Sequence, residues 1–242
     1  RDSVQDILGV VSAIPGQSRN RLELMLTGQV SSGGAMPVIR PFEHRPGQEQ
    51  PPHPEEYRSD DCLWFFNAVP VYVNETGDAA FYDQILPFAD EGEASVIGHL
   101  RRALEFNLER MGHHGLPCGL SADWNDCLRL GYTGESLFVA FQLRLGLTIY
   151  AEIAAERGEE GEASWALANC QKLDRAIQAH GWDGELFLWA IDEKGVRYGS
   201  HRQEEGQIYL NTQVWAVISE AATPSQTEQC LEAVHSRLHT PF

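Results

Sequence analysis

The segment 115–127 holds the residues whose types and spacing best suit chemistry. It places Asp123, Trp124, Asn125 and Asp126 in consecutive positions. A carboxyl group can protonate a departing glycosidic oxygen, a tryptophan can stack on the apolar face of a sugar ring, and a carboxamide can hydrogen-bond hydroxyls. The same residue types also form Asx turns, in which side chains bond their own backbone. Spacing alone therefore leaves a sugar site and a polar turn both open.

This segment is predicted to be a loop between two core-facing helices. Its glycines and Pro117 exclude a helix interior. Apolar residues recur at helical spacing over 93–111 and over 135–157, where Ser136 follows Gly134 and Glu135. A polar, aromatic loop that joins two such helices is a common position for a functional site.

The remaining pattern is also mostly helical. Pro15 is expected to end the first predicted helix, Pro70 to kink or split the third, and Thr223-Pro224 to begin the last. Residues 30–59 contain six prolines and no sustained period, so we expect a long loop that serves an active site or an interface. A β-hairpin is predicted near 185–199. The other predicted helices span 3–14, 18–28, 61–76, 162–179, 211–221 and 225–238.

Composition narrows the class of protein. At 242 residues, the chain can form one large core or two small domains. A net charge of −17 argues against binding of nucleic acid or of an anionic membrane through a basic field. No run of about eighteen apolar residues appears, so no membrane span is expected.

The cysteines indicate a reducing compartment. They are five, an odd number, and none forms a CxxC pair, so we expect free thiols, no metal site and a cytoplasmic location. Cys118 and Cys127 flank the candidate loop, and His113 and His114 are near them in sequence. We interpret both cysteines as small buried packing residues rather than as nucleophiles.

The chain resembles the inverting disaccharide phosphorylases, the cellobiose and chitobiose phosphorylase group (glycoside hydrolase family 94). Four blocks match in order and span nearly the whole chain, and the Asp-Trp-Asn-Asp block is the most telling. The blocks are Arg1-Asp2-Ser3-Val4-Gln5-Asp6 with Leu8-Gly9; Ser59-Asp60-Asp61 with Leu63-Trp64, Tyr72 and Glu75-Thr76-Gly77-Asp78; Gly115 through Cys127; and Trp182-Asp183-Gly184 with Gly206 through Asn211 and Gln213 to Ile218.

The resemblance implies an all-α fold, part of an (α/α)6 barrel. Residues 1–242 would be a partial catalytic domain, since about eight helices are too few to close the barrel. The rest of the barrel, an N-terminal β-domain, and the family's phosphate-gripping His and Thr are expected outside this stretch. The implied activity is reversible phosphorolysis of a β-linked disaccharide or oligosaccharide with inversion. Inorganic phosphate would be the co-substrate, no cofactor would be needed, and the full-length protein would be a homodimer.

The resemblance also assigns roles to residues. Asp126 would be the general acid, Trp124 would line the donor-sugar subsite, and Asp123 would be structural, in a turn. Spacing alone would not choose between the two aspartates. The other predicted substrate contacts are Arg1, Asp6, Asp60 and Asp61.

For those four residues, structural roles also stay open. Arg1 and Asp6 could instead belong to a solvated helix start with an ion pair. Asp60 or Asp61 could cap the helix that begins near 61. The sequence of this chain differs from the family pattern at Leu186 and at Trp189-Ala190. This difference puts in doubt a substrate role for the predicted hairpin. Residues 201–205 are interpreted as a solvated turn.

Two other functions remain open at this point. One is an inverting hydrolase on the same barrel, which would need a second carboxylate to activate water. The other is a non-catalytic helical fragment that binds carbohydrate. The acceptor sugar is also open among glucose, N-acetylglucosamine, gluconate and longer glucans.

Overall fold

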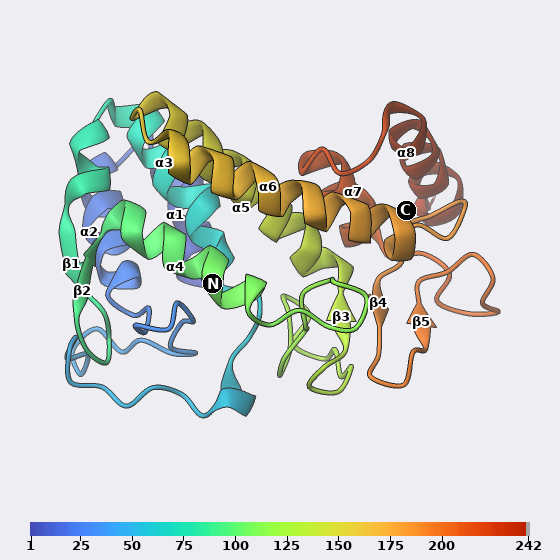
Figure 1. Ribbon diagram of the computed structural model, residues 1–242, viewed down its shortest axis with the longest axis horizontal. Helices are drawn as coiled ribbons and strands as arrows, with labels where there is room; N and C mark the ends of the chain where they lie inside the picture. Colours follow the sequence, from blue (N-terminus) through green and yellow to red (C-terminus); the bar gives the residue numbers. More distant parts are fainter. Residues whose placement is uncertain (241–242) are drawn as a thin grey trace. The chain divides into compact units, whose positions relative to one another are not determined.

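The computed structural model describes residues 1–240, and most of them are helical (Figure 1). The described part contains eight α-helices and five short strands. The chain divides into two compact units, Arg1–Glu109 and the residues from Arg110 onward. The all-α prediction and the number of helices are therefore confirmed.

The first unit is built on four helices. They are α1 (Asp2–Val10), α2 (Pro15–Leu26), α3 (Phe65–Thr76) and α4 (Val96–Leu108). The helices α1, α2 and α3 pack against one another through an apolar interior that includes Ile7, Leu22, Leu26, Phe66 and Val69.

Two prolines act differently from the prediction. Pro15 begins α2 instead of only ending α1, because a proline at the first helical position loses an N–H that would have no partner there. Pro70 lies inside α3, which continues unbroken to Thr76. Of the two predicted effects, a kink or a split, the split does not occur. The helix is instead preceded by a 3-10 turn at Asp61–Trp64.

The start of the predicted 93–111 helix is a strand. Strand β1 (Ile85–Pro87) pairs antiparallel with β2 (Glu93–Ser95), and the turn between them contains Gly92 with a φ of 76°. The helix α4 begins after Ser95, whose side chain accepts a hydrogen bond from Gly98 N at 3.2 Å. This N-cap sets the boundary between the hairpin and α4.

The 30–59 segment contains little regular structure. Its described features are an isolated bridge between Gln29 and Ala35 and a 3-10 turn at Pro54–Glu56.

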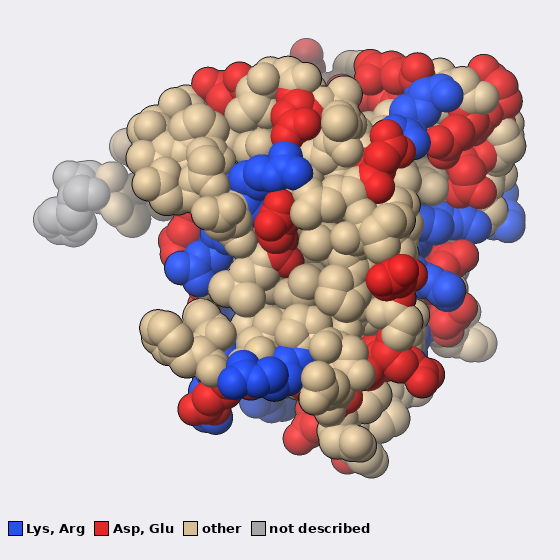
Figure 2. Space-filling model, turned by 90° about the vertical axis from the view of Figure 1, so that its left-hand side faces the viewer, with Lys and Arg blue, Asp and Glu red and all other residues tan. Residues whose placement is uncertain are grey.

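Acidic side chains spread over the face of the molecule that Figure 2 shows, with basic ones set among them. That face therefore offers a polyanion no continuous basic surface.

The second unit contains α5 (Leu137–Glu156), α6 (Glu160–Ala176), α7 (Leu210–Ile218) and α8 (Pro224–Leu238). A π-helical turn at Ile177–Gly181 extends α6. The helices α5 and α6 run side by side (Figure 1) and are linked by Arg144 Nε, which lies 2.6 Å from Asp174 Oδ1. The predicted start of α8 is confirmed by a capping box between Thr223 and Gln226.

Helix α5 is the one helix of the described residues that has the length and apolar composition of a membrane span. It is also the central helix of its unit, and 72% of its most apolar window is buried inside the structure. A buried core helix is apolar all round for the same physical reason as a membrane helix, so composition does not separate the two. The burial favours a core helix.

The hairpin predicted near 185–199 is present. Strand β4 (Ala190–Ile191) pairs antiparallel with β5 (Arg197–Tyr198). A third strand that the sequence did not reveal, β3 (Glu135–Ser136), pairs with the other edge of β4, with Ser136 opposite Ala190. Because β3 immediately precedes α5, the hairpin is attached to the start of the central helix.

The turn before the hairpin is organised by the buried carboxylate of Asp183. One oxygen accepts hydrogen bonds from the backbone of Glu185 and Leu186, and the other from Ser200 Oγ at 2.8 Å and His201 N at 2.9 Å. The His201 Nδ1 atom lies 2.7 Å from the second oxygen. His201 is therefore held to Asp183, and residues 201–205 form a turn in which Arg202, Glu204 and Glu205 are exposed, so the interpretation of a solvated turn is confirmed.

We predict that Asp183 makes stability depend on acid pH. Burial alone would raise the pKa of its carboxyl group, but the hydrogen bonds outweigh burial and hold the pKa below its ordinary value. The ionised group therefore stabilises the fold fully at neutral pH and loses its contribution as the pH falls below about 4. Asp183→Asn should lower the free energy of unfolding by about 2 kcal/mol at pH 7, and this difference should shrink at pH 3.

Urea unfolding of the two proteins at pH 7, 5 and 3 measures the difference. Glu204→Gln is the control, because it removes an exposed carboxylate from the same segment. A difference between wild type and Asp183→Asn that stays constant over this pH range would contradict the prediction.

Candidate active site

The candidate loop is closed at its base by backbone hydrogen bonds. Cys118 N donates to Arg110 O at 2.9 Å, Gly119 N donates to Gly134 O at 2.7 Å, and Ser136 N donates to Pro117 O at 3.0 Å. These bonds place the two ends of the loop beside each other at the start of α5. Residues 120–133 project from this base as the loop proper.

Asp123 is the anchor of the loop. It is 0% exposed, and its Oδ2 atom accepts a hydrogen bond from Ser136 Oγ at 2.7 Å. Its Oδ1 atom accepts from Asn125 N at 2.8 Å, which forms an Asx turn. Ser136 is also the N-cap of α5 and accepts a hydrogen bond from Val139 N. Asp123 therefore has the structural role expected of it.

The anchor leaves the next residues on the surface. Trp124 is 47% exposed and Asp126 is exposed. Asn125 Oδ1 accepts a hydrogen bond from Cys127 N at 3.1 Å, so a second Asx turn follows the first. The two aspartates that spacing could not distinguish thus lie in opposite environments. The exposed carboxyl group of Asp126 is the one that a substrate can reach.

Arg129 was not predicted, and its exposed side chain binds backbone carbonyl groups of the loop. Its Nη1 atom donates to the carbonyl oxygens of Ser121 at 3.1 Å, Asp126 at 2.8 Å and Leu128 at 2.9 Å. A guanidinium group suits this task because it presents several donors in a rigid plane. The only signal in the sequence was a basic residue at the third position after Asp126.

The β-hairpin supports the far end of the loop. Leu128 and Leu130 are buried against Ala190, and Trp189 and Tyr198 pack on the same cluster. The Trp189 ring also stacks on Tyr209 at a centroid distance of 4.0 Å. Trp189 and Tyr209 are therefore packing residues in this structure.

The cysteines beside the motif do not form a nucleophilic site. Burial, with a smaller effect of the Glu135 charge, raises the pKa of Cys118 to about 11. Such a thiol is not ionised near neutral pH. His114, a possible activating base, contacts Glu135 at 2.5 Å instead. Cys127 is exposed, so the expectation that it is a buried packing residue is wrong.

In the first unit, the structure brings Arg1 and Asp60 together. Their Nη1 and Oδ1 atoms are 3.7 Å apart, and Trp64 Nε1 donates to Asp60 Oδ2 at 2.8 Å. Asp60 is 0% exposed and occupies the N-cap position of the turn that follows it, but its side chain makes no capping hydrogen bond. Asp61, the next residue, is 6% exposed.

Asp6 lies elsewhere in the first unit. Its exposed side chain borders a cavity of about 280 Å³ between α1 and α2, which Ser3, Ser18 and Arg21 also line. The ion pair that the sequence allowed at the helix start is formed, with Asp2 as the partner of Arg1. Arg1 also contacts Asp60.

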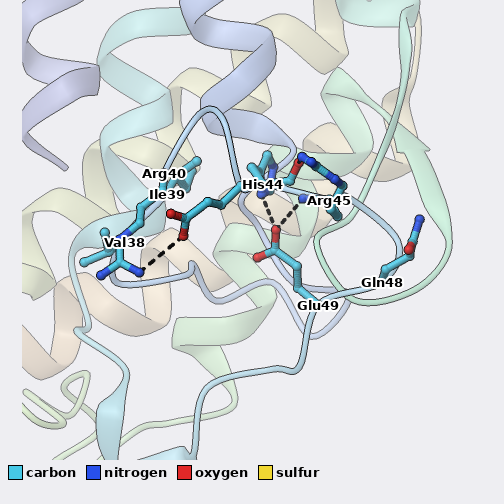
Figure 3. A pocket seen from close by; sticks show the side chains of 8 residues that line it. Val38, Ile39, Arg40, His44, Arg45, Gln48 and Glu49 are labelled. Atoms are coloured by element: carbon cyan, nitrogen blue, oxygen red, sulfur yellow. Dashed lines mark hydrogen bonds and ion pairs between the residues drawn. The ribbon is translucent and has the colours of Figure 1, made fainter.

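A larger cavity, of about 470 Å³, lies in the 30–59 segment (Figure 3). Its most buried polar group, the His44 ring, is held on one side by Thr27 Oγ1 at 3.0 Å and on the other by Glu49 Oε1 at 2.5 Å. Arg40 is paired with Glu43. The His44 ring thus already has a partner at each nitrogen, and no residue predicted for catalysis lines this cavity.

Comparison with known proteins shows the family. The model described as "Glycosyl hydrolase 94 superfamily, catalytic domain" matches residues 1–242. The chain belongs to this family. It is 33% identical over 262 residues to the N,N'-diacetylchitobiose phosphorylase of Vibrio proteolyticus, a match that covers 100% of this chain and 33% of that protein. It is 34% identical over 246 residues to the solabiose phosphorylase of Paenibacillus borealis, with coverage of 100% and 31%.

The chain therefore spans about a third of the length of the curated relatives it matches. Among solved structures, it resembles a rhamnosidase from Klebsiella oxytoca with rhamnose bound, with a TM-score of 0.65 and 17% identity. That match covers 97% of this chain and 40% of the rhamnosidase. The likeness shows the fold, and these rhamnosidases contain an (α/α)6 barrel. The predicted fold class, part of such a barrel, is confirmed.

We predict that Trp124 contributes to sugar binding and little to stability. In the full-length protein, Trp124→Ala should weaken disaccharide binding by about 1–3 kcal/mol, because stacking and apolar contact are lost. The free energy of unfolding should change by less than about 0.5 kcal/mol, because the side chain is half exposed. Calorimetric titration and thermal unfolding measure the two quantities.

Tyr132→Ala is the control, since it removes another exposed aromatic side chain from the same loop. Unchanged affinity of Trp124→Ala together with a clearly lower melting temperature would show that Trp124 packs in the interior.

Proposed function

We propose that the protein to which this chain belongs catalyses the reversible phosphorolysis of a β-linked disaccharide or oligosaccharide. The products would be an α-sugar 1-phosphate and a shorter sugar. Membership of the glycosyl hydrolase 94 family and the phosphorylase names of the relatives support this proposal. The observation in the structure that carries it is the arrangement of the loop, in which buried Asp123 leaves Asp126 and Trp124 exposed together.

In this proposal, Asp126 donates its proton to the glycosidic oxygen as the bond from that oxygen to the anomeric carbon breaks. An oxygen of inorganic phosphate attacks the anomeric carbon from the opposite face of the ring. The proton ends on the hydroxyl group of the departing sugar, and the attack from the opposite face converts the β-linkage into an α-phosphate. Phosphate is already an anion, so no second carboxylate is required to activate it.

The other predicted residues act on the donor sugar in this proposal. Trp124 provides an aromatic face for the ring. Arg1, Asp6, Asp60 and Asp61 hold hydroxyl groups or position the residues that hold them. Because Asp60 is fully buried and contacts Arg1, we propose that it acts by orienting Arg1.

We further propose that the reaction needs no cofactor, and that the protein is a cytoplasmic homodimer that binds neither nucleic acid nor membrane. The cysteines support the location, because none of the five forms a disulfide and four of them are buried. The net charge of −17 supports the exclusion of polyanionic partners.

We predict that Asp126→Asn in the full-length protein abolishes most phosphorolysis. The amide keeps the shape of the side chain but cannot donate the proton, so kcat should fall by roughly 100- to 10,000-fold. Binding of the disaccharide and the melting temperature should hardly change, because the side chain is exposed. Release of sugar 1-phosphate measures the reaction.

Asp123→Asn is the matched variant. It should lower the melting temperature as well as activity, because the carboxylate is buried and accepts two hydrogen bonds. Normal turnover by Asp126→Asn would show that the acid is another residue. Cleavage that proceeds equally well when plain buffer replaces phosphate would favour the inverting hydrolase instead.

The exposed thiol of Cys127 provides an independent test. It is the one exposed cysteine among the five, all of which lie in the described part of the chain. Iodoacetamide should label it first, and the added group beside Asp126 should block phosphorolysis. Excess disaccharide should slow the labelling, as mass spectrometry would show. Cys127→Ser is the control and should keep its activity after treatment, whereas full activity of the labelled wild type would place the substrate elsewhere.

A further inference from the structure

A second buried carboxylate, that of Glu135, lies at the base of the loop. The residue is 2% exposed. Its Oε1 atom accepts hydrogen bonds from His114 N at 2.8 Å and Leu116 N at 3.2 Å, and its Oε2 atom lies 2.5 Å from His114 Nδ1. The Glu135 side chain thus contacts three nitrogen atoms of His114 and Leu116, which lie about twenty residues earlier in the chain.

The loop base is shaped to receive this carboxylate. Gly112 N donates to Leu116 O at 2.7 Å, which folds residues 112–116 into a tight turn around Glu135. A Cβ atom on Gly112 would lie 2.3 Å from Glu135 Cγ. Only glycine leaves room for the side chain at this position. The imidazole of His114 also contacts that of His180, with ring centroids 4.8 Å apart and ring planes tilted by 53°.

Glu135 is also adjacent to the residue that holds Asp123. Glu135 and Ser136 together form strand β3, which is fixed to β4 on one side and leads into α5 on the other. Glu135 binds the stem of the loop, and Ser136 binds Asp123 within it. Glu135 and Ser136 bind the segment at two different points, Leu116 and Asp123. Together these two attachments restrain the position and the orientation of the segment that carries Asp126.

We propose that Glu135 is a positioning residue, which sets the place of Asp126 by fixing the stem of the loop through His114 and Leu116. This inference rests on the proposed function. Proton transfer to a glycosidic oxygen needs the acid within hydrogen-bond reach, and a displacement of about 1 Å can reduce the rate by about 100-fold. Loss of the Glu135 contacts should therefore lower kcat while the residues that contact the sugar remain.

The test compares two substitutions of Glu135 in the full-length protein. Glu135→Ala removes every acceptor at the base and should lower kcat by about 10- to 100-fold, with KM changed by less than about threefold. Glu135→Gln keeps an oxygen for the two backbone N–H groups and should retain kcat within about fivefold of wild type. Gly112→Ala disturbs the same contact from the other side and should resemble Glu135→Ala.

Two control variants separate positioning from general destabilisation. Arg144→Met removes the link between α5 and α6, so it should lower the melting temperature without lowering kcat at a temperature where the protein is folded. Gly161→Ala adds a methyl group where no atom lies within 4 Å and should lower neither quantity. If Glu135→Ala does not fold, Gly112→Ala and His114→Ala decide the question in its place.

Hydrogen exchange provides a readout that does not depend on the reaction. The amides of Cys118, Gly119 and Ser136, which close the loop base, should exchange faster in Glu135→Ala and at the wild-type rate in Glu135→Gln. A folded Glu135→Ala protein with wild-type kcat and unchanged exchange would overturn the proposal. Altered exchange in a protein whose wild type shows no phosphate-dependent turnover would instead contradict the proposed function and leave Glu135 as an anchor of the loop.

Discussion

The hydrogen bond from Ser136 Oγ to Asp123 Oδ2 is the interaction on which the candidate site depends. Ser136 caps the central helix of its unit, so its position is fixed by the packing of α5 against α6 and α7. Through this bond the helix start holds a loop residue that is 13 positions away. A buried carboxylate without such partners would be costly, so the loop is strongly biased toward the one conformation in which Asp123 is bound. Trp124 and Asp126 are exposed as a consequence.

Much of the fold follows from the sequence because helices are encoded locally. Apolar spacing located the eight helices of the described residues, and Thr223-Pro224 marked the start of the last one. The errors arose where one residue type serves two purposes. A proline at position 15 both follows one helix and begins the next, and residues 93–95 fit a strand as well as a helix start. Spacing does not contain the tertiary contact that decides such cases.

The site was only partly predictable for a related reason. Residue types and the family resemblance pointed to the segment 115–127 and to the two aspartates. Their different environments depend on Ser136, and the support of the loop depends on Glu135 and Arg129. Glu135 binds a turn that is distant in the sequence, and Arg129 binds backbone oxygens that belong to no recognisable motif. Neither periodicity nor spacing indicates which buried carboxylate will find which N–H group.

The most direct test is a structure of the full-length protein with its disaccharide substrate and a non-reactive phosphate analogue. The account predicts a carboxyl oxygen of Asp126 within about 2.6–3.2 Å of the glycosidic oxygen. It also predicts the Trp124 ring on the donor sugar and Asp123 still bonded to Ser136. A glycosidic oxygen hydrogen-bonded to a different carboxyl group, with Asp126 facing solvent, would contradict it.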